Sequence, residues 1–170
     1  MALRQYKIVL CGDANTGKSS YVRRICVGDF ERRYVPTLGV AVTSRLFHTS
    51  DGPVQLEFWD TAGTEKYGGL REGYYLGADA LMVFMPSEDP TTAVRWIREA
   101  RQVVTTPCPT ALCLGKADTE DTRNVAITAI SARCNRGLEE PLLQIVRKLT
   151  GRPHLAFVES PPMTLPTVTL

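Results

Sequence analysis

Apolar and polar positions alternate along the chain in a pattern that predicts an α/β domain. Short runs rich in apolar and β-branched residues, typical of strands, are separated by longer amphipathic segments, typical of helices. The expected strands are residues 5–11, 40–49, 54–60, 79–85, 110–115 and 125–130. In the first strand, residues 8–11 are all apolar, which indicates burial on both faces of a sheet. The sequence SDGP at residues 50–53 predicts a hairpin between the second and third strands.

Three amphipathic segments are expected to form helices. The first, residues 17–27, stops before Gly28; the second begins at Asp89, an N-cap residue followed by proline; the third covers residues 138–149. Each carries apolar residues at helical spacing. These stripes are Val22, Ile25 and Cys26 in the first helix, Val94, Ile97, Ala100 and Val104 in the second, and Leu138, Leu142, Ile145, Val146 and Leu149 in the third.

The last segment differs in composition from the rest. Residues 151–170 contain four prolines, which is typical of extended chain rather than helix. We expect residues 1–150 to form one domain and residues 151–170 to form an extended tail. The apolar side chains through which this tail is expected to dock are Leu155, Phe157 and Val158.

Composition and charge exclude several classes of protein. The chain has 170 residues, 44% of them hydrophobic and 22% charged, so it is neither disordered nor collagen-like nor one long coiled coil. Its formal net charge is +2, a smaller excess than a protein that binds nucleic acid through phosphate contacts normally has. The longest apolar run, residues 80–85, is much shorter than the ~20 residues of a spanning helix. Lys7 stands where the apolar core of a signal peptide should lie.

The five cysteines predict neither a disulfide framework nor a zinc site. Their number is odd, no C-x-x-C spacing occurs, and the two histidines are far apart. Cys11 and Cys113 lie in apolar runs and are expected to be buried. This usage is typical of a reducing, intracellular compartment. Because neither a myristoylation glycine nor a C-terminal prenylation cysteine is present, we expect a soluble chain without a membrane anchor.

Residues 12–19, GDANTGKS, match the phosphate-binding pattern G-x-x-x-x-G-K-[ST]. Glycines at both ends let backbone N–H groups turn toward phosphate oxygens, and the helix that follows adds the positive end of its dipole. Lys18 supplies charge to the terminal phosphates, and the Ser19 hydroxyl can bind Mg²⁺. The residues expected around the phosphates are Asp13, Ala14, Asn15, Thr16, Gly17, Lys18, Ser19 and Ser20. The motif therefore predicts a site for a nucleoside polyphosphate.

A second motif, DTAG at residues 60–63, ends the third expected strand. Asp60 at that position can hold Mg²⁺ through water. The N–H of Gly63 can meet the γ-phosphate, which would make the following loop sensitive to that phosphate. Small GTPases carry this motif, and beyond it the chain resembles the Ran family in particular. The resembling segments are residues 30–40, 46–49, 52–53, 65–71 and 73–75, within a likeness that extends from about residue 6 to residue 158.

The resemblance implies the small-GTPase form of the P-loop NTPase fold. This fold has a mostly parallel six-stranded sheet with one antiparallel hairpin strand and helices on both faces. The resemblance also implies a switch that binds GTP or GDP with Mg²⁺ and works in the nucleus and cytoplasm. Its expected partners are transport receptors, exchange factors and GTPase-activating proteins. We expect no direct contact with nucleic acid, and a monomer with a dimer as the alternative.

Roles for individual residues follow from the same resemblance. The Mg²⁺ ligands would be Ser19, Thr37 and Asp60, with Thr37 closing over the ion in the triphosphate state. The groups at the reacting phosphate would be Lys18, Gly63 and Thr64. The remaining nucleotide contacts would be Phe30, Tyr34, Lys116, Asp118, Ser131, Ala132 and Arg133.

At the base, the resemblance implies that Asp118 accepts hydrogen bonds from guanine N1 and N2 and so selects GTP over ATP. Lys116 would lie along the base, and a backbone N–H of residues 131–133 would meet the guanine oxygen. Phe30 would pack on the guanine; the alternative is an aromatic residue of the core. For Asp118 the alternative is a turn residue at the end of a strand.

Three features depart from the family pattern. Thr64 stands where the family has a glutamine that orients the attacking water. Because threonine is shorter and offers one hydroxyl, we expect slow hydrolysis, unless a second water completes the positioning. Gly115 replaces the asparagine of N-K-x-D, and the lost hydrogen bonds are expected to weaken nucleotide binding roughly ten- to a hundredfold. Only six residues separate Asp118 from the last expected strand, so we expect a strap in place of the crossover helix.

These features leave three hypotheses. The leading one is a Ran-like GTPase with weak activity. The alternative, favoured by Thr64 and Gly115, is a degenerate pseudo-GTPase or mimic that binds Ran partners with little or no turnover. The third is a phosphotransferase acting on a small molecule, but the sequence contains no arginine-rich segment typical of the lid of such enzymes.

Overall fold

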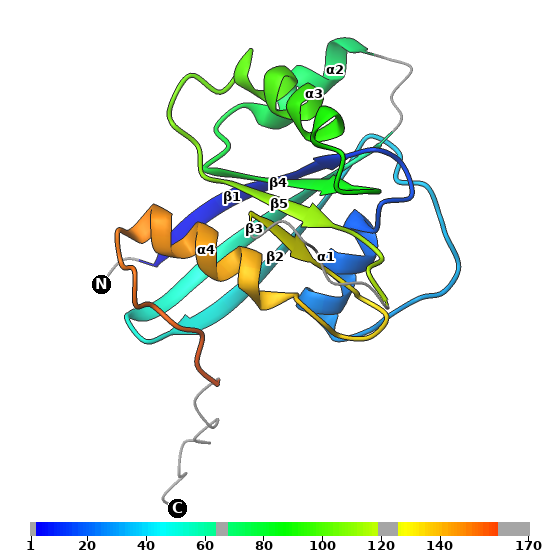
Figure 1. The fold of residues 1–170 in the computed structure, drawn as a ribbon. Coiled ribbons are helices and arrows are strands. Elements are labelled where there is room, and N and C mark those ends of the chain that lie inside the picture. Colours follow the sequence, from blue (N-terminus) through cyan, green and yellow to red (C-terminus); the bar gives the residue numbers. More distant parts are fainter. Residues whose placement is uncertain (1–2, 64–67, 119–125, 160–170) are drawn as a thin grey trace, which may run out of the picture.

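The described part of the computed structural model, residues 3–63, 68–118 and 126–159, forms a layered α/β domain around one sheet (Figure 1). Its six strands lie in the order β2-β3-β1-β4-β5-β6. Their bounds are Arg4–Gly12 (β1), Val40–Thr49 (β2), Gly52–Thr61 (β3), Ala80–Met85 (β4), Thr110–Leu114 (β5) and Ile127–Ala129 (β6). Only β2 and β3 pair antiparallel; the other four pairings are parallel. The predicted mixed sheet with one antiparallel hairpin is confirmed.

Helices cover both faces of the sheet. Their bounds are Lys18–Val27 (α1), Gly68–Tyr75 (α2), Pro90–Arg101 (α3) and Glu139–Thr150 (α4). Figure 1 shows α1 and α4 on one face and α2 and α3 on the other. In β1, Ile8 and Leu10 pack into the core beneath α1 and α4, whereas Val9 and Cys11 pack into the core on the opposite face. The apolar run in β1 is therefore buried on both sides, as its pattern predicts.

The ends of α1 and α3 follow the predicted capping chemistry. Gly17 and Gly28 flank α1 with positive φ values of 97° and 80°, a conformation that glycine adopts without steric cost. Asp89 caps α3 by accepting a hydrogen bond from the backbone N–H of Thr91 at 3.0 Å. The predicted apolar stripe of α3 needs one correction. Val94 is 49% exposed, and the buried face is formed by Ala93, Trp96 and Ala100.

Helix α2 is the element that the sequence pattern did not predict. Its sequence GGLREGYY contains three glycines, which are poor helix formers. The buried Tyr75 packs into the same core as Trp96 of α3. Tertiary packing thus compensates for weak local preference. None of the helices in the described ranges is both long enough and apolar enough to span a membrane.

The segment after α4 docks onto the β2–β3 hairpin. Leu155 is buried in the core beneath α4, and the Phe157 ring lies 5.1 Å from the Phe47 ring. The N–H of Val158 donates to the carbonyl of His48 at 2.9 Å, but the Val158 side chain is half exposed. Docking through Leu155 and Phe157 is confirmed; Val158 contributes through its backbone.

The predicted strap between Asp118 and the last strand lies in residues 119–125, outside the described residues. Strand β6 spans only Ile127–Ala129, which is shorter than the predicted 125–130. Cys11 and Cys113 are buried, as their apolar neighbours predict.

Candidate nucleotide-binding site

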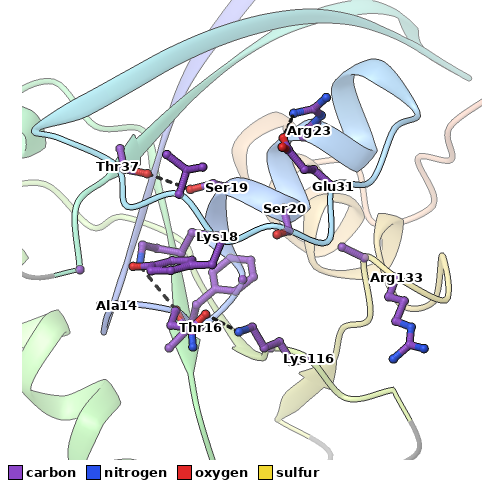
Figure 2. Close-up of a pocket in the computed structure, with 18 of the residues that line it drawn as sticks. Ala14, Thr16, Lys18, Ser19, Ser20, Arg23, Glu31, Thr37, Lys116 and Arg133 are labelled. Carbon is purple, nitrogen blue, oxygen red and sulfur yellow. Dashed lines mark hydrogen bonds and ion pairs between the residues drawn. The ribbon is translucent and has the colours of Figure 1, made fainter.

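A pocket of about 530 Å³ opens at the carboxyl ends of the central strands (Figure 2). It is lined by the loop between β1 and α1, by residues 30–37, and by segments that follow β5 and β6. In open parallel sheets, ligands characteristically bind at this edge, where connections to either face diverge. The predicted residues that line it are Ala14, Asn15, Thr16, Gly17, Lys18, Ser19, Ser20, Phe30, Tyr34, Thr37, Gly63, Lys116, Asp118, Ala132 and Arg133.

Lys18 lies at the phosphate end of the pocket, inside the curve of the 12–19 loop. It is only 5% exposed, and its Nζ donates to the carbonyls of Gly12 at 2.9 Å and Asp13 at 2.8 Å. Helix α1 begins directly after Gly17, so its unpaired N–H groups and positive dipole end face the same space. The arrangement concentrates positive charge where the motif predicts phosphate oxygens.

The Asp13 side chain lies behind the phosphate loop and does not face the pocket. Its carboxylate does not line the pocket but accepts hydrogen bonds from the Arg95 guanidinium and from Trp96 Nε1, the latter at 3.2 Å. Both donors belong to α3. The side chain of Asp13 therefore anchors the phosphate loop to the next helix. Its expected part in nucleotide binding is left to its backbone.

Three oxygen-bearing side chains converge beside the phosphate loop. Ser19 Oγ lies 2.9 Å from Thr37 Oγ1, and the Thr37 hydroxyl donates to Asp60 Oδ2 at 3.3 Å. Asp60 is 3% exposed, and its other oxygen, Oδ1, is buried without a hydrogen-bond partner among the described residues. Burial raises the pKa of Asp60, opposed by its hydrogen bond with Ser19 and by the Lys18 charge.

This cluster fits a Mg²⁺ ion. Magnesium prefers hard oxygen ligands and is often held by one carboxylate, hydroxyls and phosphate oxygens. A buried carboxylate oxygen without a partner is costly unless a cation or donor completes it. The fold thus brings together all three predicted Mg²⁺ ligands, Ser19, Thr37 and Asp60. Thr37 comes from a loop distant in sequence, and Figure 2 shows it facing Ser19.

At the opposite end of the pocket, Asp118 is oriented by a buried serine. Ser131 Oγ donates to Asp118 Oδ1 at 2.6 Å and accepts from the backbone N–H of Cys134 at 2.9 Å. Arg133 lies 3.5 Å from Asp118 Oδ2. Because Ser131 is fully buried, it supports the pocket from behind. Asp118 lines the pocket, and its contact with the guanine base stays a prediction beside the turn-residue alternative.

Phe30 lines this end of the pocket and is absent from both hydrophobic cores. The alternative of a core aromatic is therefore wrong. Lys116 has a positive φ of 58°, and its amino group donates to Asn15 Oδ1. Lys116 thereby joins the base end of the pocket to the phosphate loop. Thr64 lies outside the described residues.

A model of the Ras family matches residues 7–150 of this chain. The chain belongs to the Ras family. It is a GTP-binding small GTPase, because this family consists of GTP-dependent switches whose members typically bind Mg²⁺ with the nucleotide. The match covers β1 from residue 7 onward, the other five strands and all four helices described above.

Gly115 packs closely against the phosphate loop. A Cβ added there would lie 1.8 Å from the carbonyl oxygen of Thr16, much closer than atoms can approach. The phosphate loop of this Ras-family chain occupies the space that a side chain at residue 115 would need. The segment after β5 therefore lies directly against the phosphate loop at Gly115.

Sequence reasoning missed one residue that shapes the base end. Arg24 of α1 donates to the carbonyls of Ala132 and Arg133, and its guanidinium lies 5.9 Å from the Phe30 ring centroid. Nothing in the local sequence distinguishes it from its neighbour Arg23. Only the fold places Arg24 beside a loop more than a hundred residues away.

Proposed function

We propose that this Ras-family chain is a Ran-like switch. In this proposal it binds GTP or GDP with Mg²⁺ and presents residues 30–40 and 63–71 to nucleocytoplasmic transport receptors. Exchange factors and GTPase-activating proteins act on it, and it works in the nucleus and cytoplasm as a monomer without direct nucleic-acid contact. The observation that carries the proposal is the contact of Thr37 with both Ser19 and Asp60.

The contact of Thr37 with Ser19 and Asp60 connects the nucleotide site to the exposed 30–40 loop. Thr37 lies in the 30–40 loop, whereas Ser19 and Asp60 belong to the phosphate loop and the end of β3. When Mg²⁺ is bound, it supplies positive charge that draws these oxygens and the γ-phosphate together. The same loop carries Val35 and Leu38, which are 62% and 90% exposed. A loop held by the ion would present these apolar side chains in one arrangement to a partner.

Slow hydrolysis is part of the proposal. Gly63 lies against the phosphate loop, since an added Cβ would be 2.1 Å from the backbone nitrogen of Ala14. We therefore expect the γ-phosphate beside Gly63, the residue that precedes Thr64 in the sequence. Lys18 and the Gly63 N–H would stabilise charge on that phosphate. Threonine cannot reach and orient water as the family glutamine does.

A kinetic comparison of wild type with Thr64→Gln tests this part. We expect the variant to hydrolyse GTP several-fold faster under single-turnover conditions, because only water positioning is restored. Thr64→Ala is the control, and its rate should stay near that of wild type. Equal rates for all three proteins would place the defect elsewhere in the site.

The second candidate is a pseudo-GTPase that binds Ran partners with little turnover. The close contact of Gly115 with Thr16 favours it, because a changed base end would weaken nucleotide retention. Chromatography of the nucleotide released from freshly purified protein separates the two candidates. Bound GTP or GDP supports the switch, and an empty protein supports the binding module.

A further inference from the structure

One guanidinium joins three segments at the base end of the pocket. Arg24 Nε donates to the Ala132 carbonyl at 2.8 Å, and its other nitrogens donate to the carbonyls of Gly28 at 2.9 Å and Arg133 at 3.3 Å. Ala132 and Arg133 line the pocket, and Gly28 ends α1 immediately before the segment that carries Phe30. Arginine suits this task because its planar fork presents several donors in fixed directions.

Fixing the carbonyls of Ala132 and Arg133 also fixes the N–H groups of Arg133 and Cys134, and the N–H of Cys134 donates to Ser131 Oγ. Each peptide unit is planar and trans, so the C=O and the following N–H point in opposite directions. With the Ala132 carbonyl held toward α1, the N–H of Arg133 points away from α1. The buried Ser131 anchors the other end of the loop through Asp118. The backbone donors of this short loop consequently have little freedom to turn.

Arg24 also contacts the other wall of the pocket. Its guanidinium carbon lies 5.9 Å from the centroid of the Phe30 ring, within the range of a cation–π interaction. Arg24 therefore contacts both walls of the pocket, the one formed by Phe30 and the one formed by residues 131–133. The contacts of Arg24 are the more important for the base end because Gly115 contributes no side chain there.

We propose that Arg24 is a positioning residue for guanine recognition. It holds the backbone N–H of Arg133 toward the guanine oxygen and sets the spacing of that N–H from the Phe30 ring. The inference rests on the proposed guanine-nucleotide function and deepens it. It predicts that part of the guanine selectivity is lost when the carbonyl contacts of Arg24 are removed, although Arg24 itself does not touch the nucleotide.

Two nucleotides separate this role from a general effect on folding. GDP carries the guanine oxygen, whereas 6-thioguanosine diphosphate carries sulfur there, a weaker hydrogen-bond acceptor, and keeps the N1 and N2 hydrogens, the ring and the phosphates. Packing of Phe30 against a purine serves both ligands. The contact of the Arg133 N–H with the oxygen strengthens the binding of GDP more than that of the analogue.

Affinities for both ligands are measured with Mg²⁺ for wild type, Arg24→Gln, Arg24→Lys and the control Arg98→Gln. Arg98 is an exposed arginine of α3 outside the pocket lining. We expect Arg24→Gln to weaken GDP binding about tenfold more than binding of the analogue, the loss that one or two charged-donor contacts represent. Arg24→Lys, which keeps the charge and one donor direction, should fall between wild type and Arg24→Gln. Arg98→Gln should match wild type.

Equal losses for the two ligands in both Arg24 variants would overturn the inference, as would unchanged GDP binding. If Arg24→Gln does not fold by circular dichroism, Arg24→Lys alone decides through the same ratio of the two affinities. Failure of wild type to bind GDP would overturn the proposed function itself, which distinguishes the two failures.

Discussion

The two ends of the pocket are built in different ways. The phosphate end is formed by a continuous loop, residues 12–19, joined by Asp60 and Thr37, and Lys18 and Asp60 are buried there. The base end is assembled from segments around residues 30, 116 and 132, tied together by Arg24. The phosphate end therefore depends mainly on the backbone of one continuous segment. The base end depends on side chains that only the fold brings together.

The largest expected effect comes from the phosphate end. We expect Lys18→Ala to weaken GDP binding by about a hundredfold or more, because charged hydrogen bonds to phosphate are each worth ~1.5–3 kcal/mol. Titration with a fluorescent GDP measures it. Because Lys18 also bonds two loop carbonyls, circular dichroism of the variant accompanies the titration. Affinity within about threefold of wild type would show that the phosphates bind elsewhere.

At the base end, Asp118→Asn should change which base the pocket prefers rather than abolish nucleotide binding. The amide oxygen can still accept from Ser131 Oγ, but the NH₂ group would face the N1 and N2 hydrogens of guanine. We expect GDP binding to fall about a hundredfold and binding of xanthosine diphosphate, which offers an oxygen there, to rise. Competition titrations with the two nucleotides check this exchange. An equal loss for both would remove Asp118 from the base site.

Gly115→Ala tests the packing between the two ends. The new Cβ would meet the Thr16 carbonyl at 1.8 Å, and overpacking of this kind typically costs ~1–3 kcal/mol. The unfolding free energy should fall by that amount in urea titrations. Gly73→Ala in α2 is the matched control, since nothing lies within 4 Å of its added Cβ. If both variants have wild-type stability, the two loops are not in close contact.

The smallest effect concerns pH and Mg²⁺. Burial raises the folded-state pKa of Asp60. As pH rises, the Asp60 carboxyl group therefore stays protonated in the folded chain after it has lost its proton in the unfolded chain. The stability contributed by protonated Asp60 is complete below pH ~4 and is lost as pH rises through the folded pKa. Asp60→Asn should abolish this loss and raise the melting temperature of the metal-free chain at pH 7 by ~2–4 °C, or about 1 kcal/mol.

Magnesium should reverse the order of these two proteins. It stabilises wild type by pairing with the Asp60 carboxylate, whereas the asparagine variant offers a neutral oxygen and should gain little. Differential scanning fluorimetry with and without Mg²⁺ in the presence of GDP measures both shifts. Equal gains in the two proteins would place the ion away from Asp60.

The contrast between the two ends also explains what the sequence could predict. The strands, the caps of α1 and α3 and the 12–19 loop depend on neighbouring residues, so pattern and motif located them. The two motifs assigned Mg²⁺ binding to Ser19 and Asp60, whereas Thr37 was added only through the resemblance to a family, because its approach to them depends on the fold. The predictions for Thr64 and for the strap after Asp118 remain untested, since residues 64 and 119–125 lie outside the described ranges.

Other features depend on contacts that no local pattern contains. Arg24 and Arg23 are adjacent and chemically identical, yet only Arg24 reaches the 131–133 loop. Helix α2 forms from a glycine-rich sequence because Tyr75 is buried against the sheet. The buried face of α3 also includes Ala93 and Trp96, which the predicted stripe of Val94, Ile97, Ala100 and Val104 left out.

Competition between GDP and ADP for a fluorescent GDP in Mg²⁺ buffer is the most direct test of the central claim. That claim is that the pocket grips phosphate at one end and selects guanine at the other. It predicts that GDP binds about a hundredfold more tightly than ADP, the discrimination expected from charge-assisted hydrogen bonds at Asp118. Equal displacement by the two nucleotides would contradict it, because the base end would then recognise no guanine at all.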